Sequence, residues 1–427
     1  MKLLRAALIL VSGTLLLGQI PAPAALQKFW NAKSPTEAGK AISEIMKSGI
    51  SFDDALRALK TGRSYAAQKS GIIMGTNRTD DGVEHRYAIN VPANYDPAKR
   101  YQVRFQLHGG VGGRTTNEPR GNGAIGSLAG AEQFYVLPYA WDRAPWWGDD
   151  QVMNMDAIVD SLKRTYNIDE NRVVVAGVSD GATGAYYIGM RDTTPFASFL
   201  PLNGYIMVLA NEEIEDNRIF PNNLRNKPMF VVNGGLDRLY PTRTVGKYVE
   251  HLQESGVDIA YHPQENGEHN TAWWPTVKDV FEKFVTDNPR EPHPDTITWE
   301  TADSIHNRAH WLVIDKLGAQ PDDVKSLPDA NIMDRVAMFL RQKPVGRVDL
   351  NRNGNTIDIR SRGVAAVTLL VSPDAFDLSK PVKIVANGRT VSEGMIQPSL
   401  ETLLKWAARD NDRTMLYAAE LKVKLSR

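Results

Sequence analysis

The middle of the chain alternates between short apolar runs and longer amphipathic stretches. From about residue 82 to residue 290, β-branched and apolar runs are separated by stretches whose apolar residues recur at helical spacing. This alternation predicts an α/β fold with a mainly parallel sheet and helices on both faces. The predicted helices include Met155–Tyr166 and Thr244–Glu254. The predicted strands are Glu84–Val91, Tyr101–Leu107, Phe134–Pro138, Arg172–Ala176, Ser198–Leu202, Met229–Asn233 and Val257–His262.

A short helical segment precedes this region. Ser34 and Glu37 have the spacing of a capping box, in which a serine side chain and a glutamate satisfy free N–H groups of a first helical turn. Gly49 ends the apolar periodicity that follows, and Ser51 is suited to cap a second helix. We expect a helical hairpin over residues 25–66 that covers one side of the molecule.

The pattern changes again after a proline-rich segment, Asn288–Pro294, which can neither extend a helix nor pair inside a sheet. Beyond it, β-branched runs flank Asn353-Gly354 and Asn387-Gly388, and Asn-Gly between such runs is typical of tight hairpin turns. We therefore expect one α/β domain over residues 67–287 and a β-rich, sandwich-like module over residues 295–427.

The first residues have the pattern of an export signal. Lys2 and Arg5 precede an apolar stretch, Ala6–Gly18, and small residues follow at positions 22–24. The sequence predicts a signal peptide over residues 1–24 and a secreted or periplasmic protein. The alternative is an uncleaved anchor, which is disfavoured because the apolar run is shorter than the roughly 20 residues that a spanning helix needs. No later segment is expected to enter a membrane stably.

Composition excludes several classes of chemistry. Lys plus Arg and Asp plus Glu both total 50, so no net charge would gather nucleic acid. There is no cysteine, which excludes a thiol nucleophile, a cysteine-bound metal and disulfides. A calcium-loop-like start at Asp349 fails because Arg360 stands where a bidentate glutamate is required. We expect no metal and no cofactor, and the oligomeric state stays open.

One motif carries specific chemistry. The β-branched run Arg172–Ala176 leads into Gly177-Val178-Ser179-Asp180-Gly181, after which the sequence is helical in pattern. This is the strand, G-x-S-x-G and helix order of a nucleophile elbow, where glycines flank the serine because the backbone bends too sharply for side chains. The alternative is a tight turn with an ordinary serine. We predict that Ser179 is a nucleophile.

A nucleophilic serine needs a base and a carboxylate that orients it. Asp237 leaves the end of one predicted strand, and His269 lies on a glycine-bearing loop after the next. Two rivals exist. His262 lies inside a strand pattern, and Asp258 stands near the start of a strand, at the wrong edge of the sheet. We therefore predict Asp237 and His269 as the catalytic partners of Ser179.

Acyl transfer also needs N–H donors for the developing oxyanion. The glycine-rich loop over residues 108–113 follows an early strand, so Gly109 and Gly110 are predicted to supply one donor and the backbone of Asp180 the other. The alternative for this loop is a flexible glycine-rich turn. A carboxylate beside an oxyanion is repulsive, so we expect the Asp180 side chain to lie at the N-terminus of the following helix, where negative charge is favoured.

Aromatic residues near these motifs are candidates for substrate contacts. Trp146 and Trp147 precede the nucleophile strand, Trp273 follows His269, and His108 opens the glycine loop. Flat aromatic surfaces stack on sugar rings and phenolic groups, so these residues are predicted to bind substrate. The alternative is packing within the core.

These motifs together resemble bacterial secreted esterases. The resemblance rests on Tyr87–Pro97 (YAINVPANYDP), the HGG loop, Trp146-Trp147, GVSDG, GGLD and GEH, and it covers roughly residues 80 to 285. The similar groups are feruloyl and acetylxylan esterases, polyhydroxybutyrate depolymerase-like enzymes and phospholipase/carboxylesterase proteins. The resemblance implies an α/β-hydrolase fold, with Ser179, Asp237 and His269 as the triad. The absence of cysteine and the presence of Asp180 depart from many members and leave the substrate open.

The resulting expectation is a secreted serine carboxylic-ester hydrolase that acts through an acyl-enzyme. Feruloyl or acetyl esters of plant polysaccharide, or short polyesters, are the expected substrates. Two alternatives remain: a prolyl oligopeptidase-like serine peptidase, and a non-catalytic surface protein that binds glycan through its β-rich module.

Overall fold

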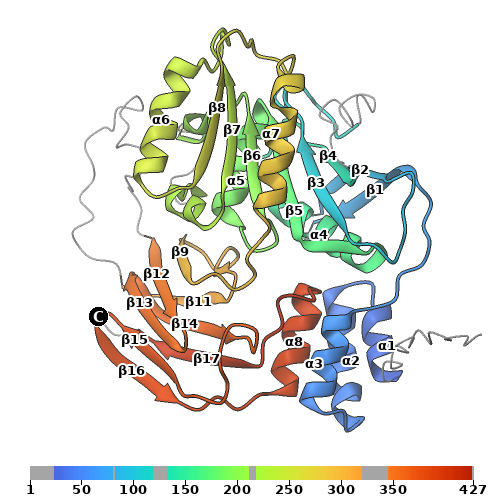
Figure 1. Cartoon of the computed structure of the whole chain (residues 1–427), viewed down its shortest axis with the longest axis vertical. Coiled ribbons are helices and arrows are strands. Elements are labelled where there is room, and N and C mark those ends of the chain that lie inside the picture. Colours follow the sequence, from blue (N-terminus) through green and yellow to red (C-terminus); the bar gives the residue numbers. More distant parts are fainter. Residues whose placement is uncertain (1–23, 80–81, 119–131, 211–217, 320–344, 426–427) are drawn as a thin grey trace, which may run out of the picture.

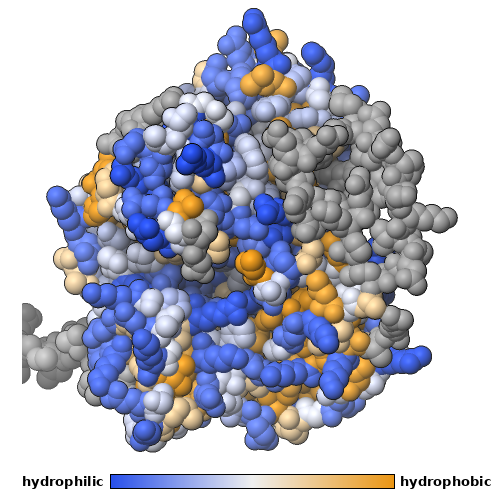
Figure 2. Space-filling model, turned by 180° about the vertical axis from the view of Figure 1, so that it is seen from behind, coloured by the Kyte–Doolittle hydropathy of each residue, from blue (hydrophilic) through white to orange (hydrophobic). Residues whose placement is uncertain are grey.

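The computed structural model describes residues 24–79, 82–118, 132–210, 218–319 and 345–425. It places an α/β domain above a β-rich module, with a group of helices beside that module (Figure 1). Seen from behind, the face of the α/β domain is largely hydrophilic, whereas apolar side chains gather lower down, over the β-rich module (Figure 2). Within the described ranges, no helix is long and apolar enough to cross a membrane. The predicted signal peptide falls almost entirely on residues 1–23, outside these ranges.

The α/β domain is built on one eight-stranded sheet with the order β1-β2-β4-β3-β5-β6-β7-β8. The β1–β2 and β2–β4 pairs are antiparallel, and every other neighbouring pair is parallel. The strands β4, β6 and β7 are buried along their whole length because helices cover both faces of the sheet. The strands are β1 (Gly71–Arg78), β2 (Glu84–Val91), β3 (Tyr101–Leu107), β4 (Phe134–Pro138), β5 (Ile168–Val178), β6 (Ser198–Leu202), β7 (Met229–Gly234) and β8 (Ile259–Gln264).

Four long helices cover this sheet. Along β5, Val173 and Val175 face a core shared with α4 (Asp149–Thr165), α5 (Asp180–Arg191) and α6 (Thr242–Glu254). Val174 and Ala176 face the opposite side, where they pack with the aromatic side chains of α7 (Trp274–Asp287). Short 3-10 turns, η1 (Ile206–Ala210) and η3 (Pro221–Asn226), follow β6. Successive side chains of a strand point to opposite faces of the sheet, so the sheet contributes to two separate cores, as the predicted α/β architecture requires.

The two predicted N-terminal helices are α2 (Pro35–Lys47) and α3 (Phe52–Thr61), and a helix that was not predicted, α1 (Ala24–Asn31), precedes them. Ser34 caps α2 as predicted, since its hydroxyl accepts the N–H of Glu37. The sequence did not predict the main packing partner of this segment. Its apolar face packs on α8 (Leu400–Asp410), a helix of the β-rich module, in one shared cluster.

The β-rich module contains two sheets around one core. Trp299 and Ile359 of one sheet pack in the same cluster as Leu312 and Leu369 of the other. The four-stranded sheet has the order β10-β11-β14-β17, and the five-stranded sheet has the order β16-β15-β13-β12-β9. The strands are β9 (Thr296–Thr301), β10 (Arg308–Ala309), β11 (Leu312–Leu317), β12 (Gly346–Asn353), β13 (Thr356–Arg362), β14 (Val364–Val371), β15 (Val382–Ala386), β16 (Arg389–Gly394) and β17 (Ala419–Lys424).

Both predicted hairpin turns of this module are present. Asn353 pairs with Thr356 across the first turn. In the second turn Asn387 has φ 49° and Gly388 has φ 78°, the left-handed backbone that a two-residue type I′ hairpin demands. The Asn-Gly signals were therefore read correctly.

The proline-rich segment between the two domains is a docked connection. It lies between α7 and β9, as the composition suggested, but the side chain of Arg290 is fully buried. Its guanidinium donates to Asn171 of the α/β domain and to Asp412 of the module. The domain connection is thus held on both sides by hydrogen bonds.

Candidate active site

The candidate nucleophile stands at a strained corner. Ser179 lies between the end of β5 and the start of α5, with φ 58° and ψ −118°. A non-glycine residue in this region costs free energy, and the surrounding structure has to impose it. Gly181 allows the close passage, because a Cβ there would lie 2.1 Å from the carbonyl oxygen of Leu107. The predicted elbow is therefore present, with its serine raised at the carboxyl edge of the sheet.

The structure brings the three predicted triad side chains together. Nε2 of His269 lies 2.9 Å from Oγ of Ser179, and Nδ1 lies 2.7 Å from Oδ2 of Asp237. The Asp237 side chain is fully buried, whereas the His269 side chain is 26% exposed. With Nδ1–H donating to the carboxylate, Nε2 is left to accept the serine proton. This is the hydrogen-bond sequence that general-base activation of a hydroxyl requires.

Backbone hydrogen bonds fix the acid loop against the histidine loop. Oδ1 of Asp237 accepts the N–H groups of Leu239 and Tyr240 at 2.8 and 2.9 Å. The N–H of Leu236 donates to the carbonyl of Gly267 at 2.9 Å, which joins the acid loop to the loop of His269. The carboxylate thus turns its second oxygen, Oδ2, toward the imidazole without freedom to rotate.

The two rival residues lie elsewhere. His262 is inside β8, where its ring stacks on Phe230 at a centroid distance of 4.3 Å and burial lowers its pKa. Asp258 is exposed and precedes β8, at the opposite edge of the sheet from Asp237. Neither residue contacts the Ser179 hydroxyl.

The predicted oxyanion loop lies directly against the nucleophile. A Cβ at Gly109 would be 2.9 Å from Cβ of Ser179, and Gly110 has φ 67°, so this path of the loop favours glycine. Asp180 is the first residue of α5, so no preceding helical turn can accept its N–H. The Gly109 backbone and the first turn of α5 thus both lie next to Ser179.

Asp180 lies in the first turn of α5, the helix N-terminus where a negative charge was expected. The sequence did not predict the partner of its carboxylate. Oδ2 accepts the N–H of Val111 at 2.7 Å, in the glycine loop. The carboxylate therefore binds another segment of the chain, 69 residues away in sequence.

His108 is a structural residue, which corrects its prediction as a substrate contact. Its Nε2 accepts the N–H of Ala140 at 3.1 Å, and its Nδ1 lies 3.0 Å from the carbonyl oxygen of Gly109. Both bonds need a neutral ring with its proton on Nδ1. Burial lowers the pKa of His108 to about 4, which favours this neutral form. His108 thus holds the start of the glycine loop.

Two of the three predicted tryptophan contacts are core residues. Trp146 is fully buried, and its indole N–H donates to the carbonyl oxygen of His108 at 2.8 Å. Trp273 is 6% exposed and packs under α7. The packing alternative holds for both, because their rings face the interior. Trp147 is only partly buried and lies at the edge of the main core, so its prediction as a substrate contact stays open.

Four side chains beside the triad were not predicted. The ring of Tyr240 stands edge-on to His269 at a centroid distance of 5.6 Å, and Tyr205 lies beside it at 5.9 Å. Leu236 and Leu239 flank Asp237 and are 59% and 62% exposed. In the sequence, the leucines on both sides of Asp237 were a usable signal for apolar side chains around the acid. Tyr240 follows three residues after that acid, whereas the position of Tyr205 depends on tertiary packing.

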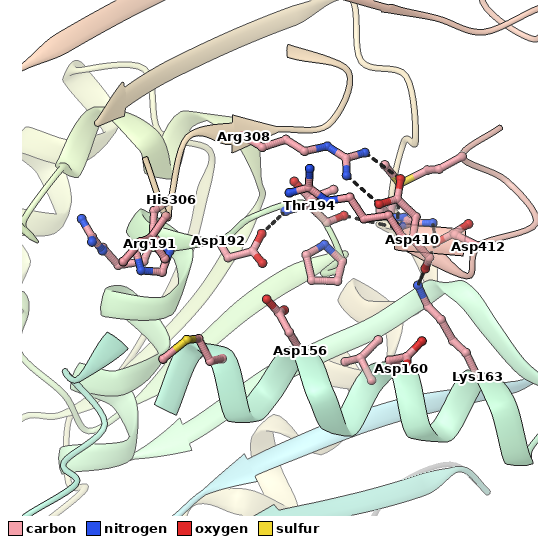
Figure 3. A pocket seen from close by; sticks show the side chains of 17 residues that line it. Asp156, Asp160, Lys163, Arg191, Asp192, Thr194, His306, Arg308, Asp410 and Asp412 are labelled. Atoms are coloured by element: carbon pink, nitrogen blue, oxygen red, sulfur yellow. Dashed lines mark hydrogen bonds and ion pairs between the residues drawn. The ribbon is translucent and has the colours of Figure 1, made fainter. Parts of the chain in front are cut away.

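A separate cavity of about 270 Å³ lies between the α/β domain and the β-rich module (Figure 3). No triad residue lines it. Lys163 and Arg290 both contact Asp412 there, and Arg308 binds Asp410 through two hydrogen bonds. These charges largely compensate one another across the domain boundary. Among the residues that the structure describes, no group of three or more His, Cys, Asp or Glu side chains could hold a metal ion.

Strand order, elbow and adjacent acid and histidine loops define an esterase-like protein of the α/β-hydrolase type. The chain is 25% identical over 186 residues to a probable feruloyl esterase C of Aspergillus terreus, which covers 41% of this chain and 67% of that protein. This similarity confirms the resemblance seen in the motifs. No family model matches the chain.

Solved structures of esterases align with about half of the chain. A thermostable esterase aligns with 20% identity and a TM-score of 0.40, over 51% of this chain and 63% of its own. A ferulic acid esterase aligns with 17% identity and a TM-score of 0.39, over 52% of this chain and 99% of its own. The chain thus matches less than two thirds of the length of the thermostable esterase.

Proposed function

We propose that this protein is a serine hydrolase that cleaves carboxylic esters through an acyl-enzyme. The single observation that carries the proposal is the continuous hydrogen-bond sequence from Asp237 through His269 to Ser179. His269 takes the proton as Oγ of Ser179 attacks the ester carbonyl, and it then gives that proton to the departing alcohol. Water attacks the acyl-enzyme in the same way and releases the acid.

The glycine loop and the start of α5 supply the electrostatic part of this mechanism. The N–H of Asp180 and an N–H of Gly109 or Gly110 stabilise the oxyanion that forms on the attacked carbonyl. Removal of one such donor typically costs about 3 to 4 kcal/mol of transition-state stabilisation. This contribution needs no metal or cofactor.

We infer an apolar or aromatic group at the ester as the preferred substrate feature. Tyr240 stands beside His269, and the exposed Leu236 and Leu239 form an apolar rim around the acid loop. Feruloyl and acetyl esters of plant polysaccharide and short polyesters are the proposed substrate classes, in keeping with the similarity to a feruloyl esterase. The basic and apolar pattern of the first 24 residues supports export as part of this proposal.

The test compares wild type with Ser179→Ala and with Ser70→Ala, an exposed serine outside the site. We expect p-nitrophenyl acetate hydrolysis and fluorophosphonate labelling in wild type and Ser70→Ala, and loss of both in Ser179→Ala. Retained turnover in Ser179→Ala would refute the assignment. An unlabelled, inactive wild type would favour a non-catalytic glycan-binding protein.

Substrate class is resolved by a panel of methyl ferulate, acetylated xylan, short polyesters, phospholipid and prolyl peptide amides. We expect the esters to be cleaved at least a hundred times faster than the amides. Faster cleavage of peptide amides would instead identify a prolyl oligopeptidase-like peptidase.

A further inference from the structure

We propose that Asp180 is a positioning residue that sets both halves of the oxyanion hole at once. Its backbone N–H is one donor, and its carboxylate holds the loop that carries the other donor. The inference rests on the proposed function and assigns a role to the residue that departs from the pattern of similar esterases.

The carboxylate of Asp180 binds the glycine loop directly. Oδ2 of Asp180 accepts the N–H of Val111 at 2.7 Å, and a hydrogen bond to a charged acceptor is about twice as strong as a neutral one. Val111 is 1% exposed, so its N–H would otherwise be left without a solvent partner. The bond therefore fixes the glycine loop at one point.

A second anchor holds the loop on the other side of the two glycines. His108 is held by the N–H of Ala140 at its ring and by the indole of Trp146 at its carbonyl. Gly109 and Gly110 lie between this anchor and Val111. Since glycines have no side chain to restrict the backbone, the direction of their N–H groups depends on the two flanking anchors.

The same hydrogen bond sets where the charge of Asp180 lies. A free carboxylate next to the nucleophile would repel a developing oxyanion. With Oδ2 bound to Val111, the Asp180 side chain is directed onto the glycine loop, while its backbone N–H stays at the N-terminus of α5. Asp180 thus places a donor on each side of the Ser179 hydroxyl, and its negative charge serves to hold the glycine loop.

The experiment compares Asp180→Ala, Asp180→Asn and Asp192→Ala. Asparagine retains an oxygen that can accept the Val111 N–H. Asp192 is a matched control at the other end of α5, where its carboxylate accepts the N–H of Thr194. We expect kcat for p-nitrophenyl acetate to fall by about ten- to a hundred-fold in Asp180→Ala. KM should change by less than about threefold, because the donors act mainly in the transition state.

Asp180→Asn should recover most of that loss, and Asp192→Ala should keep the wild-type kcat. A kcat within threefold of wild type in Asp180→Ala would overturn the inference while leaving the Ser179 assignment intact. Equal losses in Asp180→Ala and Asp180→Asn would also overturn it, since the acceptor would then not be what matters.

Hydrogen exchange supplies a readout independent of turnover. The amide of Val111 should exchange faster in Asp180→Ala than in wild type, and at nearly the wild-type rate in Asp180→Asn. An unchanged exchange rate in Asp180→Ala would overturn the inference even if the protein proved to be no esterase. If fluorophosphonate did not label the wild-type protein, that result would instead count against the proposed function.

Discussion

A Cβ atom at Gly177 would lie 1.9 Å from the carbonyl oxygen of Gly181. That oxygen belongs to the backbone, so the clash could not be relieved by moving a side chain. Both atoms belong to the backbone turn that carries Ser179. The bend that exposes the hydroxyl therefore depends on two missing side chains, and this dependence yields a first prediction.

Gly177→Ala should disrupt the elbow. The clash is with backbone, so β5 and α5 have to move apart, and we expect a loss of more than about 3 kcal/mol of stability together with loss of ester hydrolysis. Urea denaturation and p-nitrophenyl acetate turnover measure the two effects. Gly39→Ala in α2, where a Cβ meets no atom within 4 Å, should fold normally and gain about 0.5 to 1 kcal/mol. An active, stable Gly177→Ala protein would contradict the geometry.

Asp237→Asn should separate catalysis from folding. The amide oxygen can still accept the N–H groups of Leu239 and Tyr240, but the amide no longer favours the His269 tautomer that accepts the serine proton. We expect kcat to fall by about 10³- to 10⁴-fold with little change in the unfolding midpoint. Asp258→Asn, at the opposite sheet edge, should keep wild-type kcat. A similar kcat loss in both variants would remove the reason for choosing Asp237.

Acidification should destabilise the protein partly through His108. Burial lowers its folded pKa to about 4, below the 6.5 of a free histidine, so between these values the unfolded chain binds a proton that the folded chain excludes. The stabilisation is present above pH 6.5 and is lost as pH falls toward 4, an effect of about 3 kcal/mol for a shift of this size.

This contribution can be isolated with His108→Gln, which keeps an acceptor for Ala140 but does not titrate. Denaturation at pH 7, 5 and 4 should show a smaller decline for the variant than for wild type. His293, whose pKa burial also lowers to about 4, contributes equally to both proteins. Parallel declines would show that His108 does not titrate as inferred.

Asp412→Ala should weaken the connection between the two domains. The buried carboxylate contacts Arg290 at 2.8 Å and Lys163 at 3.1 Å, and its removal leaves two buried cations without their partner. Breaking such a group typically costs about 3 to 5 kcal/mol. We expect a lower urea midpoint, whereas Asp377→Ala, which removes an exposed pair with Lys380, should leave the midpoint unchanged. Equal midpoints in wild type and Asp412→Ala would argue against a buried ionic connection.

The sequence was most informative where a residue type is required by the local backbone conformation. The elbow glycines, the order of Ser179, Asp237 and His269, and the Asn-Gly turns all follow from backbone requirements that are local. All seven predicted strands are present: β2, β3, β4 and β6 have the predicted bounds, whereas β5, β7 and β8 have shifted ends; for example, the predicted strand from Val257 is β8, which begins at Ile259.

Features that depend on distant packing were missed. β1 is an edge strand whose alternate residues are exposed, so no buried apolar run marked it. α8 lies within a region dominated by hairpin signals. The direction of an indole, as in Trp146, and the partner of the Asp180 carboxylate are fixed only when segments far apart in sequence meet. These positions were therefore assigned to substrate or to a helix cap when they serve the glycine loop.

The packing of α1 to α3 on α8 sets an order of events during synthesis. The apolar faces of these first helices remain uncovered until Leu403 and Leu404, more than 300 positions later, have emerged. The N-terminal helices can therefore bury their apolar faces only after α8 has been synthesised. A chain that stops before residue 400 would leave the apolar faces of α1, α2 and α3 exposed and would be prone to aggregation.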